Sequence, residues 1–231
     1  MLKKKLILTI EGNIGAGKSF LLSSLKDKLK SDNTILFAPE PVEQFSRAFL
    51  NGQYYNPLKS YYEDPDKFAF STQMWILECY RKQLYDLSKI STERNIIIMD
   101  RGIYSSTIFT RLAHQQHYIN DFEKDFLLQA TQDIISDYFG KHWFDKYGAD
   151  KLYYLDTPLH ICEDRIAKRS RLEEKDMKGT SNILHGLNEL YNNHLKAYEE
   201  NCGRNQIEVF FHENINEIIK NFLMFLHKFE T

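Results

Sequence analysis

The chain has 231 residues, and its 30 basic and 32 acidic side chains give a formal net charge of −2, which excludes the basic surplus of a non-specific nucleic-acid binder. No apolar run approaches the roughly 20 residues of a membrane span, and no signal peptide is expected before the first apolar run. The three cysteines are widely spaced and indicate neither a disulfide framework nor a zinc site, so we expect an intracellular, cytoplasmic protein. We expect a single domain over residues 1–231.

Short β-rich runs alternate with longer amphipathic runs along the chain. In chain order, strands are predicted at Leu6–Ile10, Thr34–Ala38, Asn95–Met99, Leu152–Leu155 and Ile207–Phe211. Helices are predicted at Ser19 to about Lys30, Pro65 to about Ile90, Tyr104 to about His114, Asp121–Phe139, Pro158–Lys168, Asn182–Glu200 and Ile215–Phe229. This alternation predicts an α/β fold, in which a parallel five-stranded sheet is flanked by helices and the functional site lies at the carboxyl ends of the strands.

A glycine-rich loop follows the first predicted strand and fits the phosphate-binding pattern G-x-x-x-x-G-K-[ST]. Its residues are Gly12, Asn13, Ile14, Gly15, Ala16, Gly17, Lys18 and Ser19. Glycines let the backbone approach a polyphosphate closely, and successive N–H groups and the N-terminus of the next helix point at the same anion. Lys18 provides a positive charge near the β and γ phosphates, and Ser19 offers a hydroxyl to Mg²⁺. The loop therefore predicts a bound nucleoside triphosphate.

Two further predicted strands end on acidic side chains. Glu40 follows the second strand between Pro39 and Pro41, which limit its backbone and suit a base in a fixed geometry, although Glu40 could instead cap the next helix. Asp100 and Arg101 follow the third strand. Asp100 could hold Mg²⁺ through water and Arg101 could bind phosphate or substrate, or the two side chains could form a structural ion pair.

A run of arginines lies near the end of the predicted helix Pro158–Lys168. Arg165 and Arg169 are four residues apart, which puts them on one helix face, and Arg171 continues the run into the charged stretch Lys168–Lys178, a candidate mobile element. Arginines near a triphosphate can neutralise the charge that develops on the transferred phosphoryl group. A solvated surface would have the same composition, so the run alone does not separate the two interpretations.

Together these motifs resemble the deoxynucleoside kinase family, the group of deoxycytidine, deoxyguanosine and mitochondrial thymidine kinases, over about residues 6–200. The matching segments are Gly12–Ser19, Glu40-Pro41-Val42, Tyr62-Glu63-Asp64-Pro65, Phe70-Ser71-Thr72-Gln73, Asp100-Arg101, and the lid residues Arg165, Arg169, Arg171 and Glu174. The resemblance implies a P-loop kinase fold with a short lid at about 168–178, and ATP and Mg²⁺ as cofactors. It also implies a homodimer, for which the helices Tyr104–His114 and Asp121–Phe139 could form the interface.

The resemblance implies a role for each matching residue. The implied catalytic residues are Glu40, which accepts the proton of the substrate 5′-hydroxyl, and the cations Lys18, Arg101, Arg165, Arg169 and Arg171, which stabilise the transferred phosphoryl group. The implied metal-binding residues are Ser19 and Asp100. The implied nucleoside contacts are Phe45 at the position of a pocket tryptophan, Tyr62 and Glu174 at the 3′-hydroxyl, and Gln73 on the base.

Departures from the family pattern favour a pyrimidine substrate, deoxycytidine or thymidine. Purine-preferring and deoxycytidine-type members carry an aspartate and an arginine at the positions of Ser106 and Tyr80, and the bulky Tyr80 could narrow the pocket against purines. The family's stacking phenylalanine is replaced by Thr110, with Phe109 one residue earlier. Either Phe109 stacks on the base, or Phe45 and Gln73 hold it.

Two other interpretations remain open. A thymidylate kinase also has a phosphate loop and an Asp-Arg segment followed by serines, although Asn13 and the Glu-Pro-Val segment differ from that family's pattern. A non-catalytic, kinase-like structural subunit could tolerate loss of catalytic groups, whereas this chain keeps Lys18, Ser19 and Glu40 together. We expect a small-molecule deoxynucleoside as the partner, and neither a nucleic acid nor a membrane.

Overall fold

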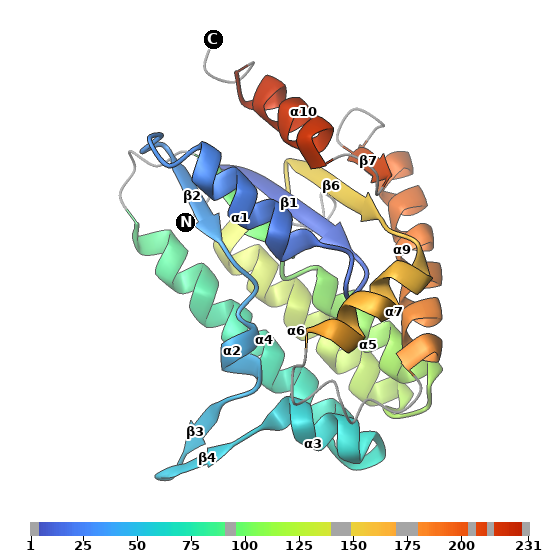
Figure 1. Ribbon diagram of the computed structural model, residues 1–231. Coiled ribbons are helices and arrows are strands. Elements are labelled where there is room, and N and C mark those ends of the chain that lie inside the picture. Colours follow the sequence, from blue (N-terminus) through green and yellow to red (C-terminus); the bar gives the residue numbers. More distant parts are fainter. Residues whose placement is uncertain are drawn as a thin grey trace.

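The predicted strands form one parallel sheet in the computed structural model, which describes residues 5–90, 96–139, 149–169, 180–202, 207–211 and 215–227. The strands are β1 (Leu6–Gly12), β2 (Ile35–Ala38), β5 (Ile96–Asp100), β6 (Lys151–Asp156) and β7 (Ile207–Phe211). Their order across the sheet is β2-β5-β1-β6-β7, so β1 lies in the middle (Figure 1). The α/β fold class and the five-stranded parallel sheet are therefore confirmed.

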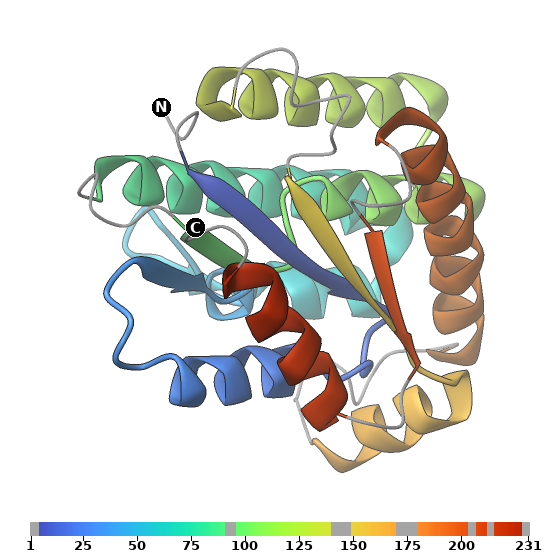
Figure 2. The ribbon, with the colours of Figure 1, turned by 90° about the horizontal axis from the view of Figure 1, so that it is seen from above.

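Helices cover both faces of this sheet (Figure 2). The helices on one face share a single apolar cluster with it and are α1 (Lys18–Lys28), α7 (Leu159–Lys168) and α10 (Ile215–His227). The helices on the other face are α4 (Pro65–Lys89), α5 (Ser105–Gln115), α6 (Asp121–Phe139) and α9 (Thr180–Cys202). No described helix combines the length and the apolar character that crossing a membrane requires.

The core divides at the sheet because successive side chains of a strand point to opposite faces. Leu8 and Ile10 of β1 belong to the cluster that contains α1 and α10, whereas Ile7 belongs to the cluster that contains α4. All three side chains are fully buried, which explains why the strand is a continuous apolar run in the sequence and not an alternating one.

Four short elements between β2 and α4 were not predicted from the sequence: α2 (Val42–Phe45), β3 (Ala48–Leu50), β4 (Gln53–Tyr55) and α3 (Pro57–Glu63). Each is too short to show a clear apolar period. The hairpin of β3 and β4, which projects from the body of the molecule (Figure 1), turns at Asn51 and Gly52, both with positive φ (50° and 79°). An Asn-Gly pair is a hairpin signal, so this turn could have been found from the sequence.

The carboxyl ends of three strands bring the predicted functional segments together. β1 ends at Gly12, where the glycine-rich loop begins, β2 ends just before Glu40, and β5 ends at Asp100, just before Arg101. Because the strands are parallel and adjacent, these ends meet at one edge of the sheet. This edge carries the candidate site.

The packing of α10 gives a direct test of the fold. Phe222 of α10 is fully buried and its ring stacks on Tyr153 of β6 with the ring centroids 4.2 Å apart. We expect Phe222→Ala to lower the free energy of unfolding by about 3–5 kcal/mol, because the substitution leaves a cavity beside Tyr153. The matched control on the same helix is Met224→Ala, because Met224 is 52% exposed and its loss should cost less than about 0.5 kcal/mol. Urea denaturation followed by circular dichroism measures both, and equal midpoints would contradict the packing described.

Candidate active site

The glycine-rich loop wraps closely around the start of α1. Gly15 and Gly17 have positive φ (80° and 103°), a conformation that side-chain-bearing residues rarely adopt. A Cβ atom at Gly15 would also lie only 2.6 Å from the carbonyl oxygen of Cys162 on α7. Glycine is therefore required there by backbone conformation and by the close approach of α7.

Contacts from two other elements hold the loop in shape. The Asn13 side-chain amide donates to the carbonyl oxygen of Leu184 on α9 (2.8 Å), and its Oδ1 atom accepts from the backbone N–H of Ile14 (2.8 Å). The hydroxyl of Thr157, which follows β6, donates to the carbonyl oxygen of Ala16 (3.0 Å). The loop is thus a preformed cradle, as phosphate binding through backbone N–H groups requires.

The ammonium group of Lys18 is buried within the loop. It donates to the carbonyl oxygens of Gly12 (3.1 Å) and Asn13 (2.8 Å). Burial, and then the positive charge of Arg101, lower the pKa of Lys18 from its ordinary value to about 8. A bound anion would therefore stabilise the charged form of Lys18.

Ser19 and Asp100 form the candidate metal site. The Ser19 hydroxyl donates to Oδ2 of Asp100 (2.6 Å), and Oδ1 of Asp100 is buried without a hydrogen-bond partner among the described residues. Burial raises the pKa of Asp100, so a cation beside it would favour its ionised form. The described residues contain no group of three or more acidic, histidine or cysteine side chains that could hold a metal. Water and phosphate oxygens would supply the remaining ligands of a Mg²⁺ ion held here.

A buried ion pair joins Arg101 to Glu40. Nη1 of Arg101 lies 2.9 Å from Oε1 and 3.0 Å from Oε2 of Glu40, and the two side chains are 6% and 14% exposed. Nη2 of the same guanidinium donates to the carbonyl oxygen of Gly12 (3.1 Å). Asp100 instead accepts from Ser19, so the ion pair that forms at this edge is between Arg101 and Glu40.

The segment around Glu40 is held against α4. The side-chain amide of Gln83 on α4 donates to the carbonyl oxygen of Pro39 (2.7 Å), and the indole N–H of Trp75 donates to that of Gln44 (2.8 Å). The N-cap residue of α2 is Pro41, without a side-chain cap. Glu40 therefore does not cap that helix, and its carboxylate faces Arg101.

Glu11 is a buried carboxylate that sequence reasoning missed. It is 5% exposed, and its Oε1 atom accepts from the Ser105 hydroxyl (2.6 Å) and the Gly102 N–H (3.1 Å). Its Oε2 atom accepts from the Tyr191 hydroxyl of α9 (3.2 Å). Burial raises the pKa of Glu11, against the opposing effects of the Ser105 hydrogen bond and the Arg101 charge. The signal in the sequence was an acidic residue in an otherwise apolar strand.

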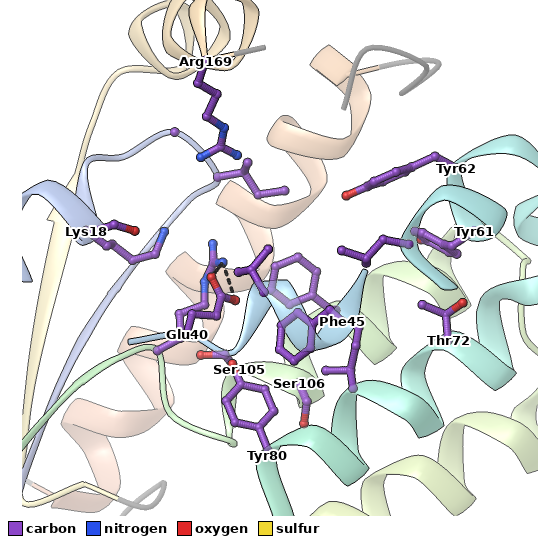
Figure 3. Close-up of a pocket in the computed structure, with 18 of the residues that line it drawn as sticks. Lys18, Glu40, Phe45, Tyr61, Tyr62, Thr72, Tyr80, Ser105, Ser106 and Arg169 are labelled. Atoms are coloured by element: carbon purple, nitrogen blue, oxygen red, sulfur yellow. Dashed lines mark hydrogen bonds and ion pairs between the residues drawn. The ribbon is translucent and has the colours of Figure 1, made fainter. Parts of the chain in front are cut away.

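A cavity of about 470 Å³ is lined by the phosphate loop, Glu40, Arg101 and residues of α3, α4 and α5 (Figure 3). Its cationic end contains Lys18, Arg165, Lys168 and Arg169. Its other end is mostly apolar and aromatic and contains Val42, Phe45, Leu58, Tyr61, Ile76, Tyr80 and Phe109. Glu40 lies between the two ends (Figure 3).

Most of the predicted site residues line this cavity: Ile14, Gly15, Gly17, Lys18, Ser19, Glu40, Phe45, Tyr62, Gln73, Tyr80, Arg101, Ser106, Phe109, Arg165 and Arg169. Within the described part of the chain, the predicted residues that support the site without lining the cavity are Gly12, Asn13, Ala16, Asp100 and Thr110. Arg171 and Glu174, and the lid stretch from residue 170 onward, lie outside the described residues.

Arg165 lies directly on the phosphate loop. Its Nη1 atom donates to the carbonyl oxygens of Gly15 (3.1 Å) and Ala16 (2.9 Å). Arg169, at the C-terminal end of α7, lines the same end of the cavity. The two arginines therefore add positive charge beside the loop, as their spacing of four residues predicted.

The aromatic end contains one polar atom in need of a partner. Oε1 of Gln73 is buried and has no hydrogen-bond partner among the described residues. Ser106, in contrast, donates to the carbonyl oxygen of Ile103 (2.7 Å). Phe109 lines the cavity, whereas Thr110 is 1% exposed and does not. Gln73 is thus the amide that a ligand at this end could satisfy.

Several residues of the cavity wall were missed by sequence reasoning. Leu58 and Tyr61 come from α3, a helix that the sequence did not predict. Thr72 and Ile76 lie on α4 on either side of Gln73 along the chain and resemble ordinary core positions. No sequence signal distinguished them from residues that only pack.

The chain is similar to known proteins over most of its length. A family model described as deoxynucleoside kinase matches residues 8–226. A probable deoxycytidine kinase of Fowlpox virus is 31% identical over 198 residues, which cover 84% of this chain and 72% of the viral protein. The mitochondrial deoxyguanosine kinase of Xenopus laevis is 25% identical over 200 residues, which cover 81% of this chain and 71% of that protein.

A solved structure of deoxyadenosine kinase from M. mycoides with bound dATP superposes with a TM-score of 0.71 at 22% identity, covering 96% of this chain and 100% of that chain. That likeness supports the fold, while the family match includes the phosphate loop, Glu40, Arg101 and α9. The chain therefore belongs to the deoxynucleoside kinase family and is a phosphotransferase.

Proposed function

We propose that this deoxynucleoside kinase transfers the γ-phosphoryl group of ATP to the 5′-hydroxyl of a pyrimidine deoxyribonucleoside, with Glu40 as the general base. The observation that supports the proposal best is the position of Glu40 between the cationic and the aromatic end of one cavity (Figure 3). A nucleoside bound with its base among the aromatic rings would have its 5′-hydroxyl near this carboxylate. The hydroxyl proton then passes to Glu40 as the oxygen attacks the γ-phosphorus.

The cationic end of the cavity suits the triphosphate. The loop N–H groups and Lys18 would bind the phosphates, and Arg101, Arg165 and Arg169 would neutralise the charge that develops during transfer, with Arg171 as a further predicted contributor. Ser19 and Asp100 would hold Mg²⁺, which supplies positive charge beside the β and γ phosphates.

The aromatic end suits a nucleoside. Phe45 and Phe109 line this end, and the Arg101 guanidinium lies over the Phe109 ring, 5.1 Å from its centroid. The unsatisfied Oε1 of Gln73 offers an acceptor to the edge of a base. The Tyr62 hydroxyl points toward the cavity, as a contact to the sugar 3′-hydroxyl requires, with Glu174 as its predicted partner (Figure 3).

The homodimer implied by the family resemblance stays a prediction. Its proposed interface helices, α5 and α6, include two exposed aromatic side chains on α6, Phe122 (75%) and Phe126 (45%). Exposed aromatic side chains of this kind are enriched at protein–protein interfaces.

The role of Glu40 can be tested by Glu40→Gln. The amide cannot accept the proton, so kcat should fall by about 10²- to 10⁴-fold while ATP affinity stays close to that of the wild type. The matched control is Glu43→Gln, three residues along and exposed, which should keep wild-type turnover. A coupled ADP-release assay and calorimetric ATP titration measure the two quantities. Near-normal turnover in Glu40→Gln would overturn the assignment of Glu40 as the general base.

The lowered pKa of Lys18, about 8, predicts a pH dependence of ATP binding. A bound triphosphate favours the charged ammonium and so raises the pKa of Lys18, which means that binding takes up a proton above pH 8. The affinity for ATP should be highest below pH 8 and fall by up to about tenfold per pH unit above it. Titration calorimetry in two buffers of different ionisation enthalpy detects the proton uptake. The same uptake in Lys18→Met would show that another group is responsible.

The pyrimidine preference can be tested with the four natural deoxynucleosides. We expect kcat/KM for deoxycytidine or thymidine to exceed that for either purine by about tenfold or more, because the buried Tyr80 narrows the aromatic end. Tyr80→Ala should reduce this ratio by enlarging the cavity. A wild-type preference for a purine deoxynucleoside would overturn the proposed pyrimidine preference. Activity on dTMP alone would indicate a thymidylate kinase.

A further inference from the structure

We propose that Glu11 is a positioning residue of the reaction, which holds Arg101, and through it Glu40, in the geometry that phosphoryl transfer needs. The proposal rests on the proposed role of Glu40 as the base. Glu11 does not line the cavity in the described residues, so it acts through its neighbours and not on the substrate.

The carboxylate of Glu11 contacts two other elements of the site. Oε1 of Glu11 accepts both the Gly102 N–H (3.1 Å) and the Ser105 hydroxyl (2.6 Å), so one oxygen fixes the turn that follows Arg101. Oε2 accepts the hydroxyl of Tyr191 (3.2 Å), which joins the same carboxylate to α9. Glu11 thus connects β1, the turn after β5 and α9 at a point next to the ion pair.

The backbone of Arg101 has an unusual conformation that depends on its neighbours. Its φ of 56° lies in the left-handed region, which is unfavourable for a residue with a long side chain and persists only where the surroundings hold it. Its own N–H donates to the carbonyl oxygen of Ile10 (3.1 Å), and the next N–H, that of Gly102, donates to Glu11. This conformation turns the guanidinium back toward Glu40 and the carbonyl oxygen of Gly12.

The charge around Arg101 changes during the proposed reaction. When the 5′-hydroxyl gives its proton to Glu40, the Glu40 carboxylate becomes neutral and Arg101 loses the negative charge of its ion-pair partner. Glu11 and Asp100 are further buried carboxylates whose charges act on Arg101. Burial raises the pKa of Glu11, and the Ser105 hydrogen bond, the Arg101 charge and the Gly102 N–H oppose that rise. In its ionised form Glu11 would hold the buried guanidinium in place while the phosphoryl group moves.

The experiment combines Glu11→Gln with Arg101→Met. The glutamine keeps an acceptor for Gly102 and Ser105 and removes the charge, so the single variant should fold and show a kcat lower by about 10- to 100-fold, with KM for ATP within about threefold of wild type. In the Arg101→Met background the same substitution should cause no further loss of kcat, because Glu11 acts through Arg101. Wild-type kcat in Glu11→Gln, or losses that multiply in the double variant, would overturn the proposal.

Two kinds of control complete the design. Glu208→Gln neutralises another strand carboxylate, one paired with Lys151 (2.7 Å) near the amino ends of β6 and β7, and should leave kcat unchanged. If Glu11→Gln fails to fold, Tyr191→Phe removes one hydrogen bond to Glu11, keeps the charge of Glu11 and leaves the cavity lining unchanged. This variant should then lower kcat several-fold at constant KM for ATP, and wild-type kcat would reject the proposal.

Failure of the proposed function gives a different pattern. The proposed role of Glu40 as the general base would be rejected by a wild-type protein that is inactive on all deoxynucleosides. A fully active Glu40→Gln variant would reject it as well. The link between Glu11 and Arg101 is then read from urea unfolding of the four proteins in the cycle. We expect Glu11→Gln to recover part of the stability that Arg101→Met loses, because it removes a buried charge left without its cation. If the losses in free energy of unfolding from Glu11→Gln and Arg101→Met are additive in the double variant, the link between Glu11 and Arg101 is rejected as well.

Discussion

The guanidinium of Arg101 joins the ends of three strands, and the site depends on that junction. Arg101 directly follows β5, donates to the carbonyl oxygen at the end of β1, and pairs with the carboxylate that follows β2. A buried arginine needs hydrogen-bond partners and a balancing negative charge. Nη1 and Nη2 of Arg101 have such partners at the strand ends, whereas Nε is buried without one among the described residues. Glu40 pairs directly with the guanidinium, and the charges of Glu11 and Asp100 also act on it.

The phosphate loop beside this junction also holds its cations in position. Lys18 is held inside the loop by carbonyl oxygens and Arg165 rests on its outer side, also on carbonyl oxygens. Both cations are thus placed before any anion arrives, and the hydrogen bonds described for them go to backbone carbonyl oxygens. A triphosphate offers full negative charges, so binding replaces weak acceptors with strong ones and needs little rearrangement of the loop.

The sheet and long helices could be predicted from the sequence because each has enough residues to show a period, and the phosphate loop because glycine, lysine and serine have fixed spacings there. Glu40 and Arg101 were found because strand ends in a parallel sheet share one edge. Leu58 and Tyr61 were missed because α3 has only seven residues, and Glu11 because its partners Ser105 and Tyr191 are far away in the sequence. Contacts of that kind arise only once the chain has folded.

The projecting hairpin of β3 and β4 is a place where the length and sequence of the chain can change. It is inserted between Phe45 of α2 and Leu58 of α3, two residues of the cavity wall. Ala48 and Tyr55 pair across its base, so the distance between the two wall segments is set there and not at the tip. The tip residues can therefore be lengthened, shortened or replaced by a fused sequence while the wall keeps its shape, which makes the hairpin a natural attachment point on this scaffold.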